Sequence, residues 1–155
     1  MKNVIILDLD GVLITTPTWK ADEMDVDGYS AFNKKCVENF NQLTENLECE
    51  LWISSTRRMN KTLQEFREIF INRNITKEIT GFLPKEGYQI SRLTEIETFL
   101  SHEPINNFLI LDDDSSLHNL EEKYKKFWVQ TSLTIGFNSE KLKEAQEIID
   151  TFWKD

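Results

Sequence analysis

A chain of 155 residues is long enough for one domain with a buried core. Its hydrophobic share of 39% is normal for a globular protein and excludes a disordered chain. Lys and Arg total 18 against 27 Asp and Glu, and the resulting net charge of -9 disfavours extended binding to nucleic acid or to acidic membranes. No apolar stretch reaches transmembrane length, so we expect no membrane partner.

The first residues and the cysteines bear on the compartment. Residues 1–3 run directly into the apolar segment 4–7 and then Asp8, which is too short and too soon charged for a signal peptide. Cys36 and Cys49 are the only cysteines, and neither has CxxC or Cys/His spacing, so we expect reduced thiols. These features predict a cytoplasmic protein.

Three short apolar segments, at residues 4–7, 51–53 and 108–111, each end abruptly in polar residues. Such segments are typical of strands buried on both faces of a parallel sheet. Residues 127–129 follow the same pattern, and residues 78–80 form a weaker fifth candidate. The sequence therefore predicts a parallel sheet of about five strands.

Apolar residues recur at helical spacing between the predicted strands. The four sets are Cys36, Phe40, Leu43 and Leu47; Leu63, Phe66 and Phe70; Ile90, Leu93, Ile96 and Leu100; and Leu142, Ala145, Ile149 and Phe152. Ser139 is the predicted cap of the last helix. The alternation of strands and helices predicts a three-layer α/β sandwich of Rossmann-like type, in a single domain over residues 1–155.

Polar side chains follow three of the predicted strands. They are Asp8 and Asp10 after the first, Ser54 and Ser55 after the second, and residues 112–114, all aspartates, after the third. Because ligands of such sheets collect at the carboxyl ends of the strands, we expect these side chains to converge.

The pair Asp8 and Asp10 suits phosphoryl transfer. Asp8 is the candidate nucleophile, since a carboxylate that attacks phosphorus forms an aspartyl-phosphate and splits hydrolysis into two easier steps. Asp10 is the candidate general acid and base, which protonates the leaving oxygen and later deprotonates the attacking water. Gly11 permits the turn that brings both carboxylates to a common site.

Several carboxylates around a phosphate require a cation. Oxygen ligands together with a substrate phosphate indicate Mg²⁺. The candidate ligands are Asp8, Asp10 through its carbonyl, and Asp112 or Asp113, with Asp114 as a further candidate.

The phosphoryl group also requires hydrogen-bond donors. Either Ser54 or Ser55 could cap the following helix while the other donates to phosphate, and Ser54 is favoured as the phosphate ligand because it is the first polar residue after the strand. The basic candidates are Lys85, Arg57, Arg58 and Arg92. The adjacent pair at positions 57 and 58 is expected at the surface.

In this order, the motifs resemble the four motifs of the haloacid dehalogenase (HAD) superfamily. The chain is most similar to the HAD domain of "Swiss army knife" RNA-repair proteins. The resemblance is carried by residues 7–13 (LDLDGVL), 36–41 (CVENFN), 53–55 (ISS), 95–100 (EIETFL), 111–115 (LDDDS) and 129–131 (VQT).

This resemblance implies a Mg²⁺-dependent hydrolase, most simply a phosphatase. The family's Arg stands three residues before its Glu-Ile pair, which here is Arg92, so Arg92 ranks ahead of Lys85 and Arg57 as a phosphate ligand. Two positions depart from the family pattern: Leu93 stands where Gly is usual, and Arg57 where a Trp is often found.

The substrate is the least defined expectation. Residues 14–48 offer only a loop and one helix, and residues 55–87 a helix and a short strand, so neither segment holds a cap domain. Capless HAD members accept a phosphorylated macromolecular end as well as small esters. The RNA-repair resemblance points to a nucleotide or nucleic-acid phosphate, whereas the net charge disfavours an extended polymer.

Three other functions are compatible with parts of the acidic pattern. A calcium loop is disfavoured because residues 12–14 are apolar where ligands would be needed. A receiver-type phosphoacceptor domain is disfavoured because such a domain normally opens with an acidic pair and has its acceptor Asp later in the chain. A non-catalytic HAD-like domain that binds a partner is the remaining alternative, and the intact pair Asp8 and Asp10 argues against it.

Overall fold

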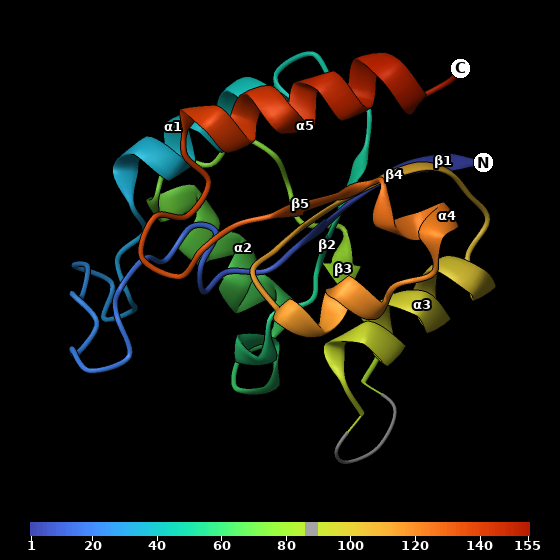
Figure 1. The fold of residues 1–155 in the computed structure, drawn as a ribbon. Helices are drawn as coiled ribbons and strands as arrows, with labels where there is room; N and C mark the ends of the chain where they lie inside the picture. The colour runs from blue at the N-terminus through green and yellow to red at the C-terminus, as the bar shows by residue number, and fades with distance from the viewer. Residues whose placement is uncertain (86–89) are drawn as a thin grey trace.

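The computed structural model describes residues 1–85 and 90–155 (Figure 1). Five strands, all parallel, form one sheet in the order β3-β2-β1-β4-β5. Their bounds are β1 (Lys2–Leu7), β2 (Glu50–Ile53), β3 (Gly81–Phe82), β4 (Ile105–Asp112) and β5 (Trp128–Gln130). The predicted parallel sheet is confirmed, and β1 lies at its centre.

Helices cover both faces of the sheet. They are α1 (Lys34–Thr44), α2 (Leu63–Asn72), α3 (Arg92–His102), α4 (Glu122–Lys125) and α5 (Ser139–Phe152), with short 3-10 helices η1 (Thr56–Met59) and η2 (Ser115–Asn119). Side chains of α1, α2 and α5 pack on one face, and those of α3 and η2 on the other. Figure 1 shows α1 and α5 on the opposite side of the sheet from α3 and α4. The predicted three-layer sandwich is confirmed.

Alternation along the central strand explains its unbroken apolar run. Ile5 and Leu7 point into the core under α1, α2 and α5, whereas Val4 and Ile6 point into the core under α3, and all four are fully buried. A strand with helices on both faces has no polar side to present.

Several element boundaries differ from the prediction: α1 ends at Thr44, before Leu47, and α3 begins at Arg92, after Ile90. Two other differences have a local cause. The edge strand β3 begins just after residues 78–80, because the hydroxyl of Thr80 accepts a hydrogen bond from the Leu51 N–H at 3.1 Å and takes a ladder position. The cap of α5 is Asn138, whose side chain accepts from the Lys141 N–H at 3.0 Å, so Ser139 is the first helical residue and not the cap.

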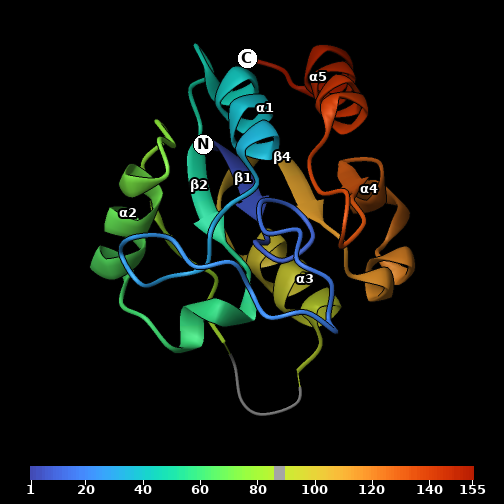
Figure 2. The same ribbon diagram turned by 90° about the vertical axis from the view of Figure 1, so that its left-hand side faces the viewer.

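The segment between β1 and α1 is a loop, as expected, and it is tied down by the Arg73 side chain. Arg73, at the end of α2, donates to both carboxylate oxygens of Asp27 at 2.6 and 2.9 Å and to the carbonyls of Tyr29 and Ser30 at 3.1 Å. Figure 2 shows this loop, in blue, running beside η1 and α2. Neither this loop nor the segment between β2 and β3 forms a cap domain.

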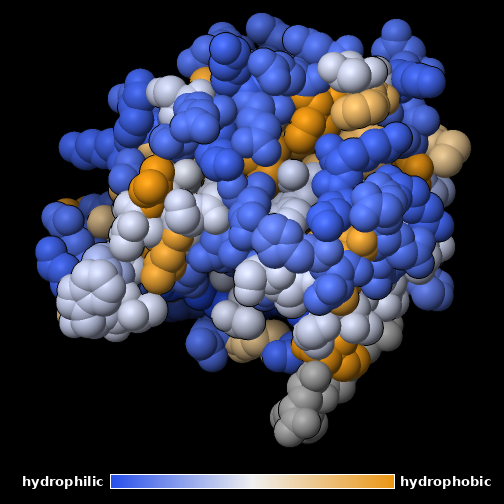
Figure 3. Space-filling view, viewed as in Figure 1, coloured by the Kyte–Doolittle hydropathy of each residue, from blue (hydrophilic) through white to orange (hydrophobic). Residues whose placement is uncertain are grey.

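The surface seen in Figure 3 is largely hydrophilic, with hydrophobic side chains in separate spots. Three of the large exposed hydrophobic side chains, Trp19, Met24 and Val26, lie on the loop between β1 and α1. Cys36 is buried and Cys49 is half-buried, and both are free thiols. Within residues 1–85 and 90–155, every helix is too short or too polar to cross a membrane.

Candidate active site

Asp8 occupies the centre of the carboxyl edge of the sheet. It follows β1 directly, and the parallel registers place Ser54 beside it on one side and Asp112 on the other. The Asp8 N–H donates to the Leu111 carbonyl at 3.0 Å, and the Ser54 N–H donates to the Leu7 carbonyl at 2.9 Å. Asp8 is 4% exposed and its two neighbours are fully buried, so three predicted strand-end residues converge.

A tight turn follows Asp8. The Leu9 carbonyl accepts hydrogen bonds from the N–H groups of residues 12–14, at 2.9 to 3.1 Å. Gly11 adopts φ +80°, and a Cβ there would lie 2.3 Å from Asp113 Oδ2. Gly11 is therefore required twice, for the left-handed backbone and for the close approach of an acidic side chain.

Asp8, Asp112 and Asp113 each offer a carboxylate oxygen, and these oxygens lie within 4.8 Å of one another. Burial raises the pKa of Asp8 to about 6, and the charge of Asp113 adds to the rise while Arg92 opposes it. Burial and then the charge of Asp8 raise the pKa of Asp112 to about 7. The pKa of Asp113 is raised by burial and by Asp112. Crowded carboxylates of this kind favour either protonation or a bound cation.

Arg92, the first residue of α3, is the cation nearest the centre of this cluster. Its Nη1 lies 2.6 Å from Asp112 Oδ2 and 3.5 Å from Asp8 Oδ2, and its side chain is 9% exposed. Burial opposes its charge, but the charges of Asp112 and Asp8 outweigh that and raise the pKa of the guanidinium. Of the four basic candidates, Arg92 is the one that contacts Asp8 and Asp112.

Asp10 is half-exposed and is bound by Arg57 and not by the acidic cluster. Arg57 Nε donates to Asp10 Oδ2 at 2.8 Å, and Arg57 Nη2 donates to Asp10 Oδ1 at 2.9 Å. Nη2 also contacts Asp22 Oδ2 at 2.8 Å. Because Nε and Nη2 of Arg57 already bind two carboxylates, Arg57 is a weaker candidate for a phosphate ligand than Arg92.

The two serines after β2 have different surroundings. Ser55 Oγ accepts the Arg57 N–H at 3.2 Å and caps η1. Ser54 Oγ is buried and has no hydrogen-bond partner among the described residues. The hydroxyls of Ser116 and Thr131 are also buried without such a partner, so it is the position of Ser54 next to Asp8 that marks its free hydroxyl as a candidate for binding a ligand.

Two further candidates lie outside the acidic cluster. Asp114 Oδ1 accepts the Ser116 N–H at 2.9 Å and caps η2. Lys85 is exposed after β3, at the end of the first described range.

Arg58 and Glu95 form a buried ion pair that was not expected from the sequence. The prediction that Arg58 lies at the surface is wrong, since it is 5% exposed. Its guanidinium also donates to the carbonyls of Ser54, Ser55 and Leu83, the last two at 2.9 and 3.0 Å. No spacing signal marks Arg58 in the sequence, because its partners come from three separate segments.

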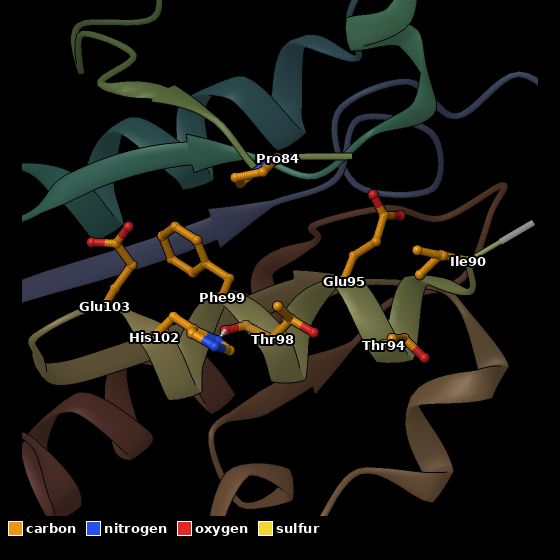
Figure 4. A pocket seen from close by; sticks show the side chains of 8 residues that line it. All are labelled: Pro84, Ile90, Thr94, Glu95, Thr98, Phe99, His102 and Glu103. Carbon is orange, nitrogen blue, oxygen red and sulfur yellow. Dashed lines mark hydrogen bonds between the residues drawn. The ribbon is translucent and has the colours of Figure 1, made fainter. Parts of the chain in front are cut away.

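A cavity of about 200 Å³ lies along α3 beyond this ion pair. Figure 4 shows Glu95 and Phe99 projecting from α3 toward Pro84, with Thr98 and His102 on the near side of the same helix. The Glu95 carboxylate at one end is already engaged by Arg58. Among the described residues, those that line the cavity do not include Asp8, Asp112 or Asp113, so the cavity is separate from the acidic cluster at the strand ends.

Comparisons with known proteins identify the family of the chain. Neither the curated proteins nor the solved structures gave a significant match. The family described as "HAD domain in Swiss Army Knife RNA repair proteins" matches residues 4–142, a span that includes all three strand ends and Arg92. The sequence resemblance is thus confirmed, and the chain belongs to this HAD domain family.

Proposed function

We propose that this HAD-type hydrolase domain is a Mg²⁺-dependent phosphomonoesterase that acts through an aspartyl-phosphate on Asp8. The observation that carries the proposal is the position of Asp8, at the end of the central strand between Ser54 and Asp112, with the Arg92 guanidinium 3.5 Å away. A nucleophile beside a buried hydroxyl and a cation has the surroundings that phosphoryl transfer requires.

In the first step, an Asp8 carboxylate oxygen attacks phosphorus, and the bond from phosphorus to the ester oxygen breaks. Asp10 gives its proton to that leaving oxygen. In the second step, Asp10 takes a proton from water, whose oxygen attacks the phosphorus of the aspartyl-phosphate and releases inorganic phosphate. The Asp8 carboxylate and the Asp10 proton are both restored.

Arg92 and Ser54 are the proposed phosphate ligands. Arg92 already faces Asp8, and its guanidinium supplies donors and positive charge for phosphoryl oxygens. Ser54 follows β2 next to the end of β1, and its buried hydroxyl has no partner in residues 1–85 and 90–155. Ser55, Lys85 and Arg57 rank behind them, since Ser55 caps η1, Lys85 is exposed and Arg57 is bound to Asp10.

The acidic cluster fits a magnesium ion. Asp8, Asp112 and Asp113 offer three carboxylate oxygens within 4.8 Å of one another, and hard oxygen donors are what Mg²⁺ prefers. The Asp10 carbonyl is a further proposed ligand, whereas Asp114 is occupied as the cap of η2. Bound Mg²⁺ supplies positive charge that offsets the repulsion between the cluster and a phosphate.

The proposed substrate is a phosphate ester that binds at the carboxyl edge of the sheet, which no cap domain covers in the described part of the chain. The family's description, RNA repair, favours a nucleotide or a terminal phosphate of a nucleic acid. A terminal phosphate needs only a local cation such as Arg92, so the net charge of -9 is compatible with it. A cytoplasmic location stays a prediction from the sequence.

The test is phosphate release with Mg²⁺ from p-nitrophenyl phosphate and from a panel of nucleotides, 3'- and 5'-phosphorylated oligonucleotides, sugar phosphates and phosphopeptides. Asp8→Asn should lower turnover by about 10³-fold or more, since it removes the nucleophile. Asp150→Asn makes the same chemical change at an exposed position of α5 and should leave turnover unchanged. Absence of Mg²⁺-dependent, Asp8-dependent turnover on the whole panel would favour a non-catalytic binding domain instead.

A further inference from the structure

The side chain of Arg57, in the 3-10 helix η1, forms hydrogen bonds with Asp10 and with three residues of the loop between β1 and α1. Every nitrogen of its guanidinium group is engaged. Besides the two hydrogen bonds to Asp10 and the one to Asp22, Arg57 Nη1 donates to Ser30 Oγ at 3.1 Å and to the Tyr29 hydroxyl at 3.3 Å.

The contact with Asp10 is a two-point contact. Nε and Nη2 of Arg57 each meet a different oxygen of the same carboxylate, at 2.8 and 2.9 Å. Two parallel hydrogen bonds from a planar group fix the plane of the carboxylate, which a single bond does not. Among the described residues, no other group bonds to the Asp10 side chain, and that side chain is 41% exposed. The orientation of Asp10 therefore depends on Arg57.

Arg57 is itself held by groups on the other side. Asp22 accepts from Nη2 at 2.8 Å, and the Ser30 hydroxyl donates to the same Asp22 oxygen. Three cationic groups lie close to the ring of Tyr29: the guanidinium carbons of Arg57 and Arg73 and Nζ of Lys61 are 5.6, 5.7 and 5.8 Å from its centroid. The loop between β1 and α1 thus has a defined conformation around Arg57.

We propose that Arg57 is a positioning residue for Asp10, and that Asp22 keeps Arg57 in place. This inference rests on the proposed function, in which Asp10 transfers the proton to the leaving oxygen. The two arginines have different roles in this proposal: Arg92 lies next to Asp8 and binds the phosphate, whereas Arg57 orients Asp10, which protonates the leaving group. Residues that orient a reacting group are needed for its efficiency although they do not touch the substrate.

The test separates leaving groups by their need for a proton. The anion of p-nitrophenol leaves without protonation, whereas the alkoxide of glycerol 2-phosphate does not. Arg57→Met should therefore lower kcat/KM for glycerol 2-phosphate by about 10- to 100-fold and that for p-nitrophenyl phosphate by less than about 3-fold. Using kcat/KM restricts the comparison to steps up to leaving-group departure.

Three variants sharpen the comparison. Arg57→Lys keeps the charge but loses the two-point contact, so it should behave like Arg57→Met. Asp22→Ala should give a smaller loss with the same dependence on the leaving group. Arg67→Met removes an arginine of α2 whose Nε binds the Ile79 carbonyl, away from Asp10, and should leave both substrates unaffected.

A double variant gives the decisive comparison. If Arg57 acts through Asp10, Arg57→Met added to Asp10→Asn should cause less than about 3-fold further loss on glycerol 2-phosphate. Equal losses on both substrates from Arg57→Met, or additive losses in the double variant, would overturn the inference while leaving the proposed function standing. A wild-type protein inactive on both substrates and on the wider panel would overturn the proposed function and, with it, this inference.

Discussion

The guanidinium of Arg58, next to the strand end of β2, is paired in the interior with the carboxylate of Glu95, one helical turn beyond Arg92 in α3. Both side chains are nearly inaccessible to solvent, at 2% and 6% exposed. Burial lowers the pKa of Arg58, and the charge of Glu95 opposes that shift. The pair links the Ser54 carbonyl to the helix that carries Arg92.

Loss of one partner should therefore be costly. Glu95→Ala would leave the Arg58 charge buried and unpaired, and we expect the free energy of unfolding to fall by about 3–5 kcal/mol. Urea denaturation followed by circular dichroism measures the loss. Glu147→Ala, at an exposed site of α5, should change stability by less than about 0.5 kcal/mol. Similar losses of unfolding free energy in the two variants would show that the ion pair between Arg58 and Glu95 contributes no more to stability than an exposed residue does.

The two serines after β2 should separate catalysis from stability. Ser54→Ala removes a hydroxyl without a described partner, so we expect little loss of stability but about 10²-fold lower kcat/KM. Ser55→Ala removes the cap of η1 and should lower the free energy of unfolding by about 1 kcal/mol, with a smaller effect on kcat/KM. Thermal unfolding and phosphate release on both variants check this. The reverse pattern would assign the phosphate to Ser55.

Two glycines with nearly the same backbone conformation provide a matched pair. Gly11 has φ +80° and Gly28 has φ +81°, so Ala is strained by a similar amount at each, about 1–2 kcal/mol. A Cβ at Gly28 meets nothing within 4 Å, whereas at Gly11 it would meet Asp113. Gly11→Ala should therefore also weaken Mg²⁺ binding, measured by isothermal titration calorimetry, about 10-fold or more beyond Gly28→Ala. Equal affinities in the two variants would exclude Asp113 from the metal site.

Without metal, the dependence of stability on pH should be opposite in direction to that of a carboxylate whose pKa is lowered by folding, because burial outweighs the effect of Arg92 on Asp8 and Asp112. Asp8 and Asp112 have pKa values of about 6 and 7 in the folded protein, against 3.8 for an ordinary Asp. Between these limits the folded state holds more protons than the unfolded chain, so the free energy of unfolding falls as pH rises from about 4 to about 7. The melting temperature in EDTA should decrease across this window.

Magnesium should reverse that loss. At about 100 times its Kd, a ligand that binds only the folded state adds about 2.7 kcal/mol, or about 5–10 °C in melting temperature for a chain of this size. Protons compete with the metal for Asp8 and Asp112, so the gain should be larger at pH 8 than at pH 5. NaCl at equal ionic strength is the control. A gain independent of pH, or one retained in Asp112→Asn, would contradict the proposed site.

The sequence alone determined the fold class and the acidic half of the site. Strands that are buried on both faces of a parallel sheet are apolar along their length. Apolar segments such as residues 4–7 and 108–111 therefore identify the strands, and the first polar residue after each segment predicts where the strand ends. Because parallel strands share one carboxyl edge, Asp8 and Asp112 follow as neighbours without further information. Capping residues were harder to place, as Asn138 and Ser139 are both good caps and only backbone geometry distinguishes them.

Only the tertiary structure decided what each arginine does. Arg57 and Arg58 are adjacent in sequence and equally basic, yet one binds Asp10 and the other is buried on Glu95. Asp10 is 47 residues from Arg57, and Glu95 is 37 residues from Arg58. The direction in which a long flexible side chain points leaves no periodic pattern in the sequence. The strand ends follow from local patterns of burial, whereas ion pairs depend on which segments the finished fold brings within a few ångströms of each other.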